Sequence, residues 1–258
     1  MDSSNADIGI ELGAPCWMDL LSSDIDASVA FYTGLFGWDC QVDPNPEMQG
    51  YRYFEKSGKA TGGCMRNEPE WGAPDGWSIF LKSLDVRATA TAAEKAGGAI
   101  LMPPMDVEPN GSFTILSDPG GARISAWQPK EEQGFGVLDE DGAASHFELQ
   151  TPDYDRSVQF YKDVFGVETK AVSEGDFRYT TFGGVDHDSA GIMDSAIFPK
   201  GTVPIGWLVY FKTHDIQMAL KQVDALGGKC TDGPEDTPYG KLATAIDPTG
   251  SVFKLRQV

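Results

Sequence analysis

Two short segments of the chain carry side chains that could perform acid–base chemistry or bind anions. His146 and Glu148 lie two residues apart in SHFELQ, and Lys254 and Arg256 lie two residues apart in VFKLRQ. Both segments are predicted strands, so each pair shares one face. A histidine beside a carboxylate can accept a proton near neutral pH. Two cations opposite an acid can orient a carboxylate, enolate or phenolate oxygen.

These segments belong to an internal duplication. The segment from Asp24 to Asp39 realigns on that from Asp153 to Glu168, with eight identities in sixteen positions. GWSIFLKSLD then matches GWLVYFKTHD, and DPGG matches DPTG, in the same order. Such self-similarity marks repeated structural units. We predict a tail (1–12), a first domain (13–128), an acidic linker (129–143) and a second domain (144–258).

Each half reads as a strand, a helix and further strands, written twice. CWMDLL and SHFELQ open the two halves. In the first half Ser23 or Asp24 can cap a helix that stops at Gly37. The pattern restarts with WSIFLKS, and helices are predicted from Val86 to Lys95 and, in the second half, from Ile216 to Leu226. This alternation predicts an α+β fold.

The paired strand–helix–three-strand modules, with F-Y-x-x-x-F-G closing the first helix, resemble the vicinal oxygen chelate superfamily. That group contains glyoxalase I, bleomycin-resistance proteins, fosfomycin-resistance enzymes and extradiol dioxygenases. The chain especially resembles tandem-domain bacterial members often labelled hydroxylases, through a W-x-[DE]-L strand, LMPPMDV (Leu101 to Val107) and a DPxGA strand lead. The resemblance implies two tandem glyoxalase/bleomycin-resistance-like domains. Each would consist of two paired βαβββ modules, with a curled sheet around a cleft and helices outside.

Metal-using members of this superfamily place His or Glu ligands in the first and last strands of their modules, and a divalent ion needs three or four of them. The matching positions here hold Trp17, Met65, Ser78 and Ser125 in the first domain, and His146, Met193, Leu208 and Lys254 in the second. Of these, His146 alone could bind a metal, and Lys254 would repel one. His187, in VDHDSAG, and His214 are expected to be solvated loop residues. We therefore expect neither a metal nor another cofactor.

The resemblance also implies two unlike clefts. The first would be apolar and suited to a flat hydrophobic ligand, with candidate binding residues Trp17, Asp19, Met65, Phe80 and Trp127, and with Arg123 as a further polar point. The second would be polar, with His146 and Glu148 as candidate catalytic residues and Met193, Tyr210, Lys254 and Arg256 as candidate binding residues. Two alternatives stay open. Glu148 could simply pair with a cation while His146 is a hydrogen-bonded polar residue, and the apolar side chains could simply fill the core.

The composition of the chain argues against some classes of binding partner. Lys and Arg total 20 against 39 Asp and Glu, a formal net charge of −19. This argues against a nucleic acid or an anionic membrane surface as partner. The four cysteines form no C-x-x-C pair, and the acidic N-terminus does not resemble a signal peptide. We expect a cytoplasmic protein with a small-molecule ligand, and a monomer with internal pseudo-twofold symmetry.

The function we predict is metal-free binding of a small hydrophobic or aromatic molecule, of antibiotic or natural-product type, as in drug-sequestering resistance proteins. The alternative is a cofactor-independent tailoring enzyme (isomerase, cyclase or hydroxylase-like) that uses His146 and Glu148 as an acid–base pair. A metal-dependent lyase or dioxygenase ranks third, because the ligand positions do not supply a metal site.

Overall fold

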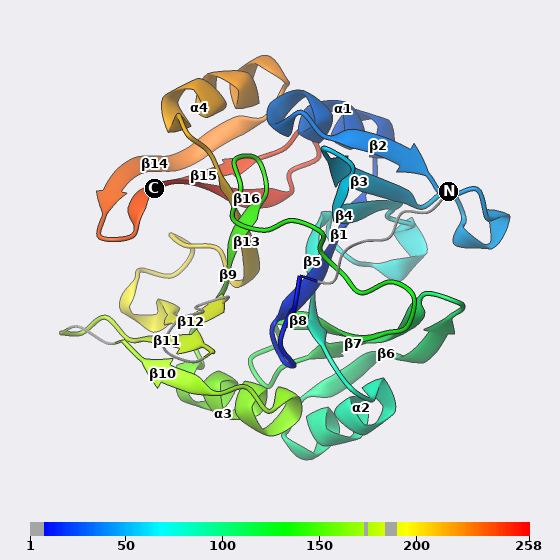
Figure 1. The fold of residues 1–258 in the computed structure, drawn as a ribbon. Coiled ribbons are helices and arrows are strands. Elements are labelled where there is room, and N and C mark those ends of the chain that lie inside the picture. Colours follow the sequence, from blue (N-terminus) through cyan, green and yellow to red (C-terminus); the bar gives the residue numbers. More distant parts are fainter. Residues whose placement is uncertain (1–7, 173–174, 184–189) are drawn as a thin grey trace.

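The computed structural model describes residues 8–172, 175–183 and 190–258 and folds them into two eight-stranded sheets with the helices outside (Figure 1). The first domain begins with one module and continues with a second. The first module is β1 (Pro15–Ser22), α1 (Ile25–Phe36), β2 (Asp39–Val42), β3 (Arg52–Lys56) and β4 (Lys59–Arg66). The second is β5 (Gly76–Lys82), α2 (Val86–Lys95), β6 (Ala99–Val107), β7 (Gly111–Ser117) and β8 (Arg123–Pro129).

The second domain repeats this order. Its first module is β9 (Ala144–Thr151), α3 (Tyr154–Phe165), β10 (Thr169–Ala171), β11 (Tyr179–Phe182) and β12 (Ala190–Asp194). Its second is β13 (Gly206–Lys212), α4 (Ile216–Ala225), β14 (Lys229–Thr237), β15 (Gly240–Ile246) and β16 (Val252–Gln257). Short 3₁₀ turns lie at Pro46–Met48, Pro69–Trp71 and Ser195–Ile197. No helix in the described ranges is long and apolar enough to cross a membrane.

The two sheets have matching strand orders, β2-β3-β4-β1-β5-β8-β7-β6 and β10-β11-β12-β9-β13-β16-β15-β14. In each, the opening strand pairs parallel with the last strand of its own module and antiparallel with the first strand of the next (β1 with β4 and β5; β9 with β12 and β13). The modules therefore pair within a domain, as the resemblance implies.

The local signals act as the sequence predicts. Asp24 caps α1 by accepting a hydrogen bond from the Ala27 N–H, and Gly37 ends the helix in the left-handed conformation (φ 68°) that favours glycine. Helix α2 has the predicted bounds, and α4 ends one residue before the predicted Leu226.

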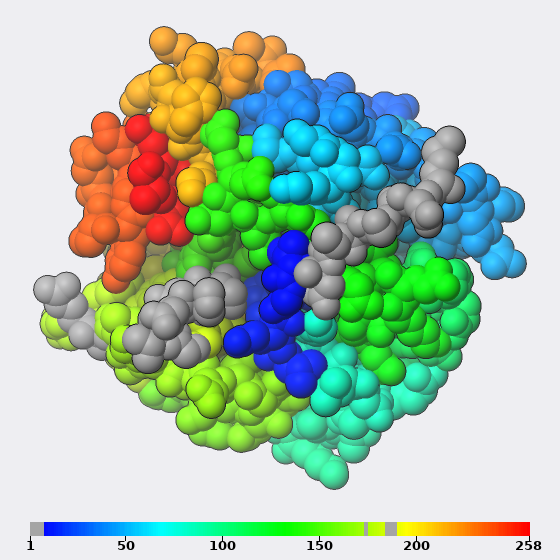
Figure 2. Space-filling model, in the orientation of Figure 1, coloured from blue at the N-terminus to red at the C-terminus, as the bar shows by residue number. Residues whose placement is uncertain are grey.

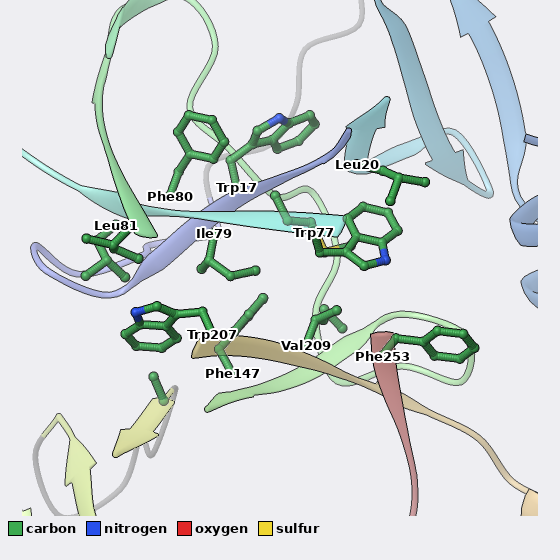
Figure 3. Close-up of a cluster of buried hydrophobic side chains, with 14 of the residues drawn as sticks. Trp17, Leu20, Trp77, Ile79, Phe80, Leu81, Phe147, Trp207, Val209 and Phe253 are labelled. Carbon is green, nitrogen blue, oxygen red and sulfur yellow. The ribbon is translucent and has the colours of Figure 1, made fainter. Parts of the chain in front are cut away.

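The duplicated blocks meet in the core between the domains (Figure 3). Trp77 of β5 donates its indole N–H to the Tyr32 hydroxyl of α1 (3.0 Å), and Trp207 of β13 donates to Tyr161 of α3 (2.8 Å). Tyr32 also packs its ring on Phe253 of the other domain, with ring centroids 5.8 Å apart. Figure 3 shows Trp77 and Ile79 on one sheet facing Trp207, Phe147 and Val209 on the other. Helix α1 accordingly lies against α4, and α2 against α3 (Figure 1).

The connection between the sheets, residues 130–143, packs against both domains. The Phe135 N–H donates to the Cys16 carbonyl (2.9 Å) and the Gly136 N–H donates to the Ala60 carbonyl (2.8 Å). The buried Phe135 ring stacks on Phe147 of β9, with centroids 5.7 Å apart. In Figure 2 this connection (green) lies on the same face as the chain that follows residue 8 (dark blue). A segment whose composition suggests a loose tether thus helps to hold the domains together.

Candidate functional site

Strand alternation in β9 separates the core from the second cleft. Phe147 and Leu149 are fully buried toward the other domain, so His146, Glu148 and Gln150 point to the opposite face of the sheet. On neighbouring strands Tyr210 lies opposite both His146 and Lys254, Leu208 lies opposite Glu148, and Met193 lies opposite Gln150. The predicted residues of this cleft therefore lie on adjoining strands, and most of them are brought together.

Glu148 is the centre of a polar cluster. Its Oε1 accepts hydrogen bonds from the Tyr210 hydroxyl (2.8 Å) and the Gln150 amide (2.6 Å), and the Lys254 Nζ lies 4.0 Å away. The Lys254 Nζ also sits 5.2 Å from the centre of the Tyr210 ring. Burial, and next the Glu148 charge, raise the pKa of Tyr210 well above its usual value, so this phenol stays protonated and donates.

His146 meets a different tyrosine. Its Nε2 lies 2.8 Å from the Tyr179 hydroxyl of β11, and its ring approaches that of Tyr210 edge-on at 5.5 Å. Tyr179 reaches this place because Gly191 lies beneath it, and a Cβ on Gly191 would lie 2.1 Å from the hydroxyl oxygen. The predicted acid–base pair thus shares a face, but each member bonds to its own tyrosine.

The remaining predicted cation is placed elsewhere. The Arg256 Nε donates to the Tyr239 carbonyl (3.1 Å), in the turn between β14 and β15. Of the two cations, Lys254 is the one paired with the acid in this cleft.

The first cleft contains a second polar cluster, at the matched strand positions. The Trp17 indole donates to Asp19 Oδ1 (2.9 Å) and lies 3.0 Å from the Tyr51 hydroxyl, which itself donates to Asp19 Oδ1 (2.5 Å). Gly63 makes room, since a Cβ there would lie 1.8 Å from the Tyr51 hydroxyl. Burial raises the pKa of Asp19 from 3.8 to about 6, against the opposing effect of the two hydrogen bonds.

The apolar residues predicted for the first cleft lie around this cluster. Figure 3 shows Trp17 and Phe80 on the side of the sheet away from Ile79. Phe80 packs edge-on against Phe113, and the Trp127 indole donates to the Glu132 carbonyl (3.0 Å). Met65 is half-buried and Arg123 is exposed at the start of β8. Trp17 and Phe80 thus share the face predicted for the first cleft, and they are nearly as buried as core side chains.

The donor set does not fit a divalent metal. The former ligand positions of the second domain carry His146, Met193, Leu208 and Lys254, and the Lys254 ammonium lies beside the nearest carboxylate. Within the described part of the chain no three His, Cys, Asp or Glu side chains come together as ligands. His214 pairs with the exposed Asp141 (3.1 Å). His187 and its acidic neighbours lie outside the described residues.

Sequence reasoning missed both tyrosines, Tyr51 and Tyr179. Each reaches the first strand of its module from another strand or its edge, across a glycine, and one-strand alternation does not reveal such a contact. The signal that could have found them is the glycine in GGCM and AGIM, which leaves open space above the strand.

Comparisons with known proteins place this geometry in a family. The model of the Glyoxalase/Bleomycin resistance protein/Dioxygenase superfamily matches residues 16–126 and 143–255. The chain is 31% identical to "Anthracycline biosynthesis protein DauV" of Streptomyces sp. (strain C5), covering 94% of this chain and 92% of the relative. It is also 31% identical to "Putative glyoxylase CFP32" of Mycobacterium tuberculosis (strain CDC 1551 / Oshkosh), covering 94% of each.

Solved structures agree on the fold. The Mn(II)-bound glyoxalase from Novosphingobium aromaticivorans matches with a TM-score of 0.66 at 17% identity, covering 95% of this chain and 82% of that one. The 2,3-dioxygenase LapB from Pseudomonas sp. KL28 matches with a TM-score of 0.66 at 15% identity, covering 96% and 92%. The chain belongs to the glyoxalase/bleomycin resistance protein/dioxygenase superfamily, as a member with two tandem domains.

Proposed function

We propose that this protein binds a small aromatic molecule of natural-product type in a domain cleft, without a metal ion. The observation that carries the proposal is the Lys254–Glu148 pair in the second cleft, where a metal-using relative would need a ligand and this chain has an ammonium group. The relatives named for anthracycline biosynthesis indicate the kind of ligand, a fused aromatic ring system with phenolic oxygens.

The second cleft has the groups that such a ligand requires. Lys254, only 15% exposed in its side chain, offers a cation to a phenolate oxygen. The Tyr210 hydroxyl belongs to the neighbouring strand β13, and the Tyr179 hydroxyl of β11 contacts His146. Met193 adds a polarisable apolar wall. Because Glu148 already accepts two hydrogen bonds, it holds Lys254 and Tyr210 in position rather than standing ready as a base.

Daunorubicin, a fluorescent anthracycline, provides the test. We expect EDTA-treated protein to quench its fluorescence with one site per chain, and Lys254→Met to weaken binding at least tenfold. Lys59→Met, which removes an exposed lysine paired with Glu140, is the matched control and should bind normally. Binding that required an added divalent metal, or that ignored Lys254→Met and His146→Gln alike, would contradict the proposal.

A second candidate function rests on His146. With its Nε2 2.8 Å from the Tyr179 hydroxyl, this imidazole could pass a proton to or from a ligand carbon beside a carbonyl, as an isomerase or cyclase requires. In D₂O, such a reaction would exchange deuterium into the bound ligand, and His146→Gln would abolish the exchange. A ligand recovered with unchanged mass from the wild-type protein would favour binding alone.

We further infer that a single chain is the working unit in the cytoplasm. The two domains already pack on each other through Tyr32 against Phe253, α1 against α4 and α2 against α3. Sedimentation velocity should therefore show one species at the mass of the monomer. A stable dimer would contradict this inference without touching the cleft assignment.

A further inference from the structure

A cavity of about 400 Å³ lies at the seam between the domains, where β5 and β13 begin. Trp77 and Ile79 line it from the first domain, and Trp207 and Leu208 line it from the second. Figure 3 shows Ile79 turned toward Trp207 and Trp77 above Val209 of the second domain. Small-molecule pockets commonly measure about 300–1,000 Å³, so this space is large enough for a ligand.

Glycines of the duplicated motifs border this seam cavity. Gly76 and Gly206 begin β5 and β13, and Gly121 and Gly250 belong to the DPGG and DPTG turns. A Cβ on any of the four would meet no atom within 4 Å. The backbone at these points therefore faces open space, and the same motifs shape it from both halves of the chain.

Arg123 gives the seam cavity one uncommitted cation. Its side chain lines the cavity at the start of β8 and makes no hydrogen bond or ion pair with any residue in the described ranges. Arg87 and Arg156, by contrast, pair with aspartates at 2.9 and 2.8 Å. In a chain with a net charge of −19, an unpaired guanidinium beside apolar walls is a place for an anion.

The acidic residue that lines the cavity, Asp75, already accepts hydrogen bonds from the protein. Asp75 accepts hydrogen bonds from the Ser23 N–H and hydroxyl and from the Asn67 amide. Burial opposes ionisation of this carboxyl, but together these hydrogen bonds bring its pKa below the usual value. Its charge is thus held by the chain's own donors, while that of Arg123 is not.

We propose that the seam cavity, which adjoins the first cleft at Ser78 and Ser125, is a ligand site of its own that takes a flat apolar molecule bearing one carboxylate. The ring system lies among the side chains contributed by both domains, and the carboxylate pairs with Arg123. Since both domains contribute to the walls, such a ligand stabilises their contact by binding only the folded, docked form.

Isothermal titration calorimetry of the full chain with 2-naphthoate tests this site, and 2-naphthylmethanol serves as the neutral analogue. We expect naphthoate to bind about tenfold more tightly than the alcohol, the effect of one charge-assisted contact. Arg123→Gln should remove that difference. Arg66→Gln, at the exposed end of β4 and away from the cavity, is the matched control and should keep it.

A second pair of variants tests the site from the other domain. Ile205 lines the cavity and is 59% exposed, so Ile205→Glu places a like charge beside the carboxylate without disturbing the core. This substitution should weaken the binding of naphthoate and leave the binding of the alcohol unchanged. Ile197→Glu, at an exposed position outside the lining, should change neither.

Four results would overturn the proposal. Naphthoate affinity could be the same in Arg123→Gln and Ile205→Glu as in the wild type, or absent at millimolar concentration. It could instead fall with Trp17→Phe or Lys254→Met, which would place the anion in a cleft and leave the proposed function standing. A dimer that excludes naphthoate would assign the cavity to self-association.

Discussion

Beside the interface between the domains, each half of the chain makes the same contact within itself. Trp77 and Trp207 each donate an indole N–H to a helix tyrosine, and the tyrosines occupy matched places in the F-Y-x-x-x-F-G motif. In the clefts the halves differ. The positions of Trp17 and Asp19 on β1 are those of His146 and Glu148 on β9.

This contrast separates what holds the molecule together from what it binds. Two packed domains need complementary side chains on both sides of the interface. A substitution in one half therefore lowers stability unless a compensating substitution occurs in the other. A cleft has no such partner, and its two copies can diverge. The clefts nevertheless share one arrangement, a tyrosine hydroxyl that lies above a glycine and hydrogen-bonds to a side chain of the first strand. In the first cleft the hydroxyl bonds to Trp17 and Asp19, and in the second it bonds to His146.

Substitutions at the interface between the domains should lower the free energy of unfolding more than substitutions elsewhere. Trp207→Ala removes a buried aromatic side chain and should lower the free energy of unfolding by about 3–5 kcal/mol, and Trp77→Ala should do the same. Urea denaturation measures both. A large loss in one variant and almost none in the other would show that the two halves of the interface are not equivalent.

The first cleft should show a pH dependence of its own. Because burial raises the pKa of Asp19 from 3.8 to about 6, the protonated carboxyl favours the folded state. That contribution is complete below pH 4 and is lost as the pH rises through 6, by up to about 3 kcal/mol. Asp19→Asn should therefore gain stability relative to the wild type from pH 4 to pH 8. A stability difference that stays constant over this range would refute the assignment to Asp19.

Removing the carboxylate charge in the second cleft should lower stability, whereas removing it in the first cleft should raise stability at high pH. Glu148→Gln removes the charge that faces Lys254 and accepts the Tyr210 hydrogen bond, so it should destabilise the protein by about 2 kcal/mol at pH 8. Thermal unfolding of Glu148→Gln beside Asp19→Asn gives the comparison. If both variants moved stability the same way, the two carboxylates would not differ in role.

Surface contacts of the connection between the domains should contribute least to stability. Lys59 pairs with Glu140 at 3.1 Å, and both side chains are more than half exposed. Lys59→Met should change the free energy of unfolding by less than about 0.5 kcal/mol. A loss comparable to that of Trp207→Ala would mean that the domain contact is electrostatic rather than packed.

The fold could be predicted because its signals are local and occur twice. Asp24 and Gly37 mark the ends of α1 by their own chemistry, and the repeat of GW and DPxG sets the order of the strands. Strand alternation also predicted that His146 and Glu148 share a face of the sheet opposite Lys254, and the structure places these residues on adjoining strands. What alternation cannot give is the pairing between strands, so the Tyr51 and Tyr179 contacts required the structure.

The packing of the connection and the presence of the seam cavity could not be predicted from the sequence. Phe135 is an isolated aromatic residue in a segment with neither helical nor strand periodicity, and its burial depends on Phe147 of the other domain. Arg123 was assigned to the first cleft from its strand, but it also lines a cavity formed by residues of both domains. Contacts between domains leave no periodic pattern to read.

The most direct test of the central claim is equilibrium dialysis of EDTA-treated protein against daunorubicin, with the metal content of the same sample measured by elemental analysis. The metal-free cleft predicts about one ligand bound per chain with no stoichiometric transition metal, and an affinity at least tenfold weaker in Lys254→Met. Ligand binding that appears only after one equivalent of a transition metal is added would contradict it.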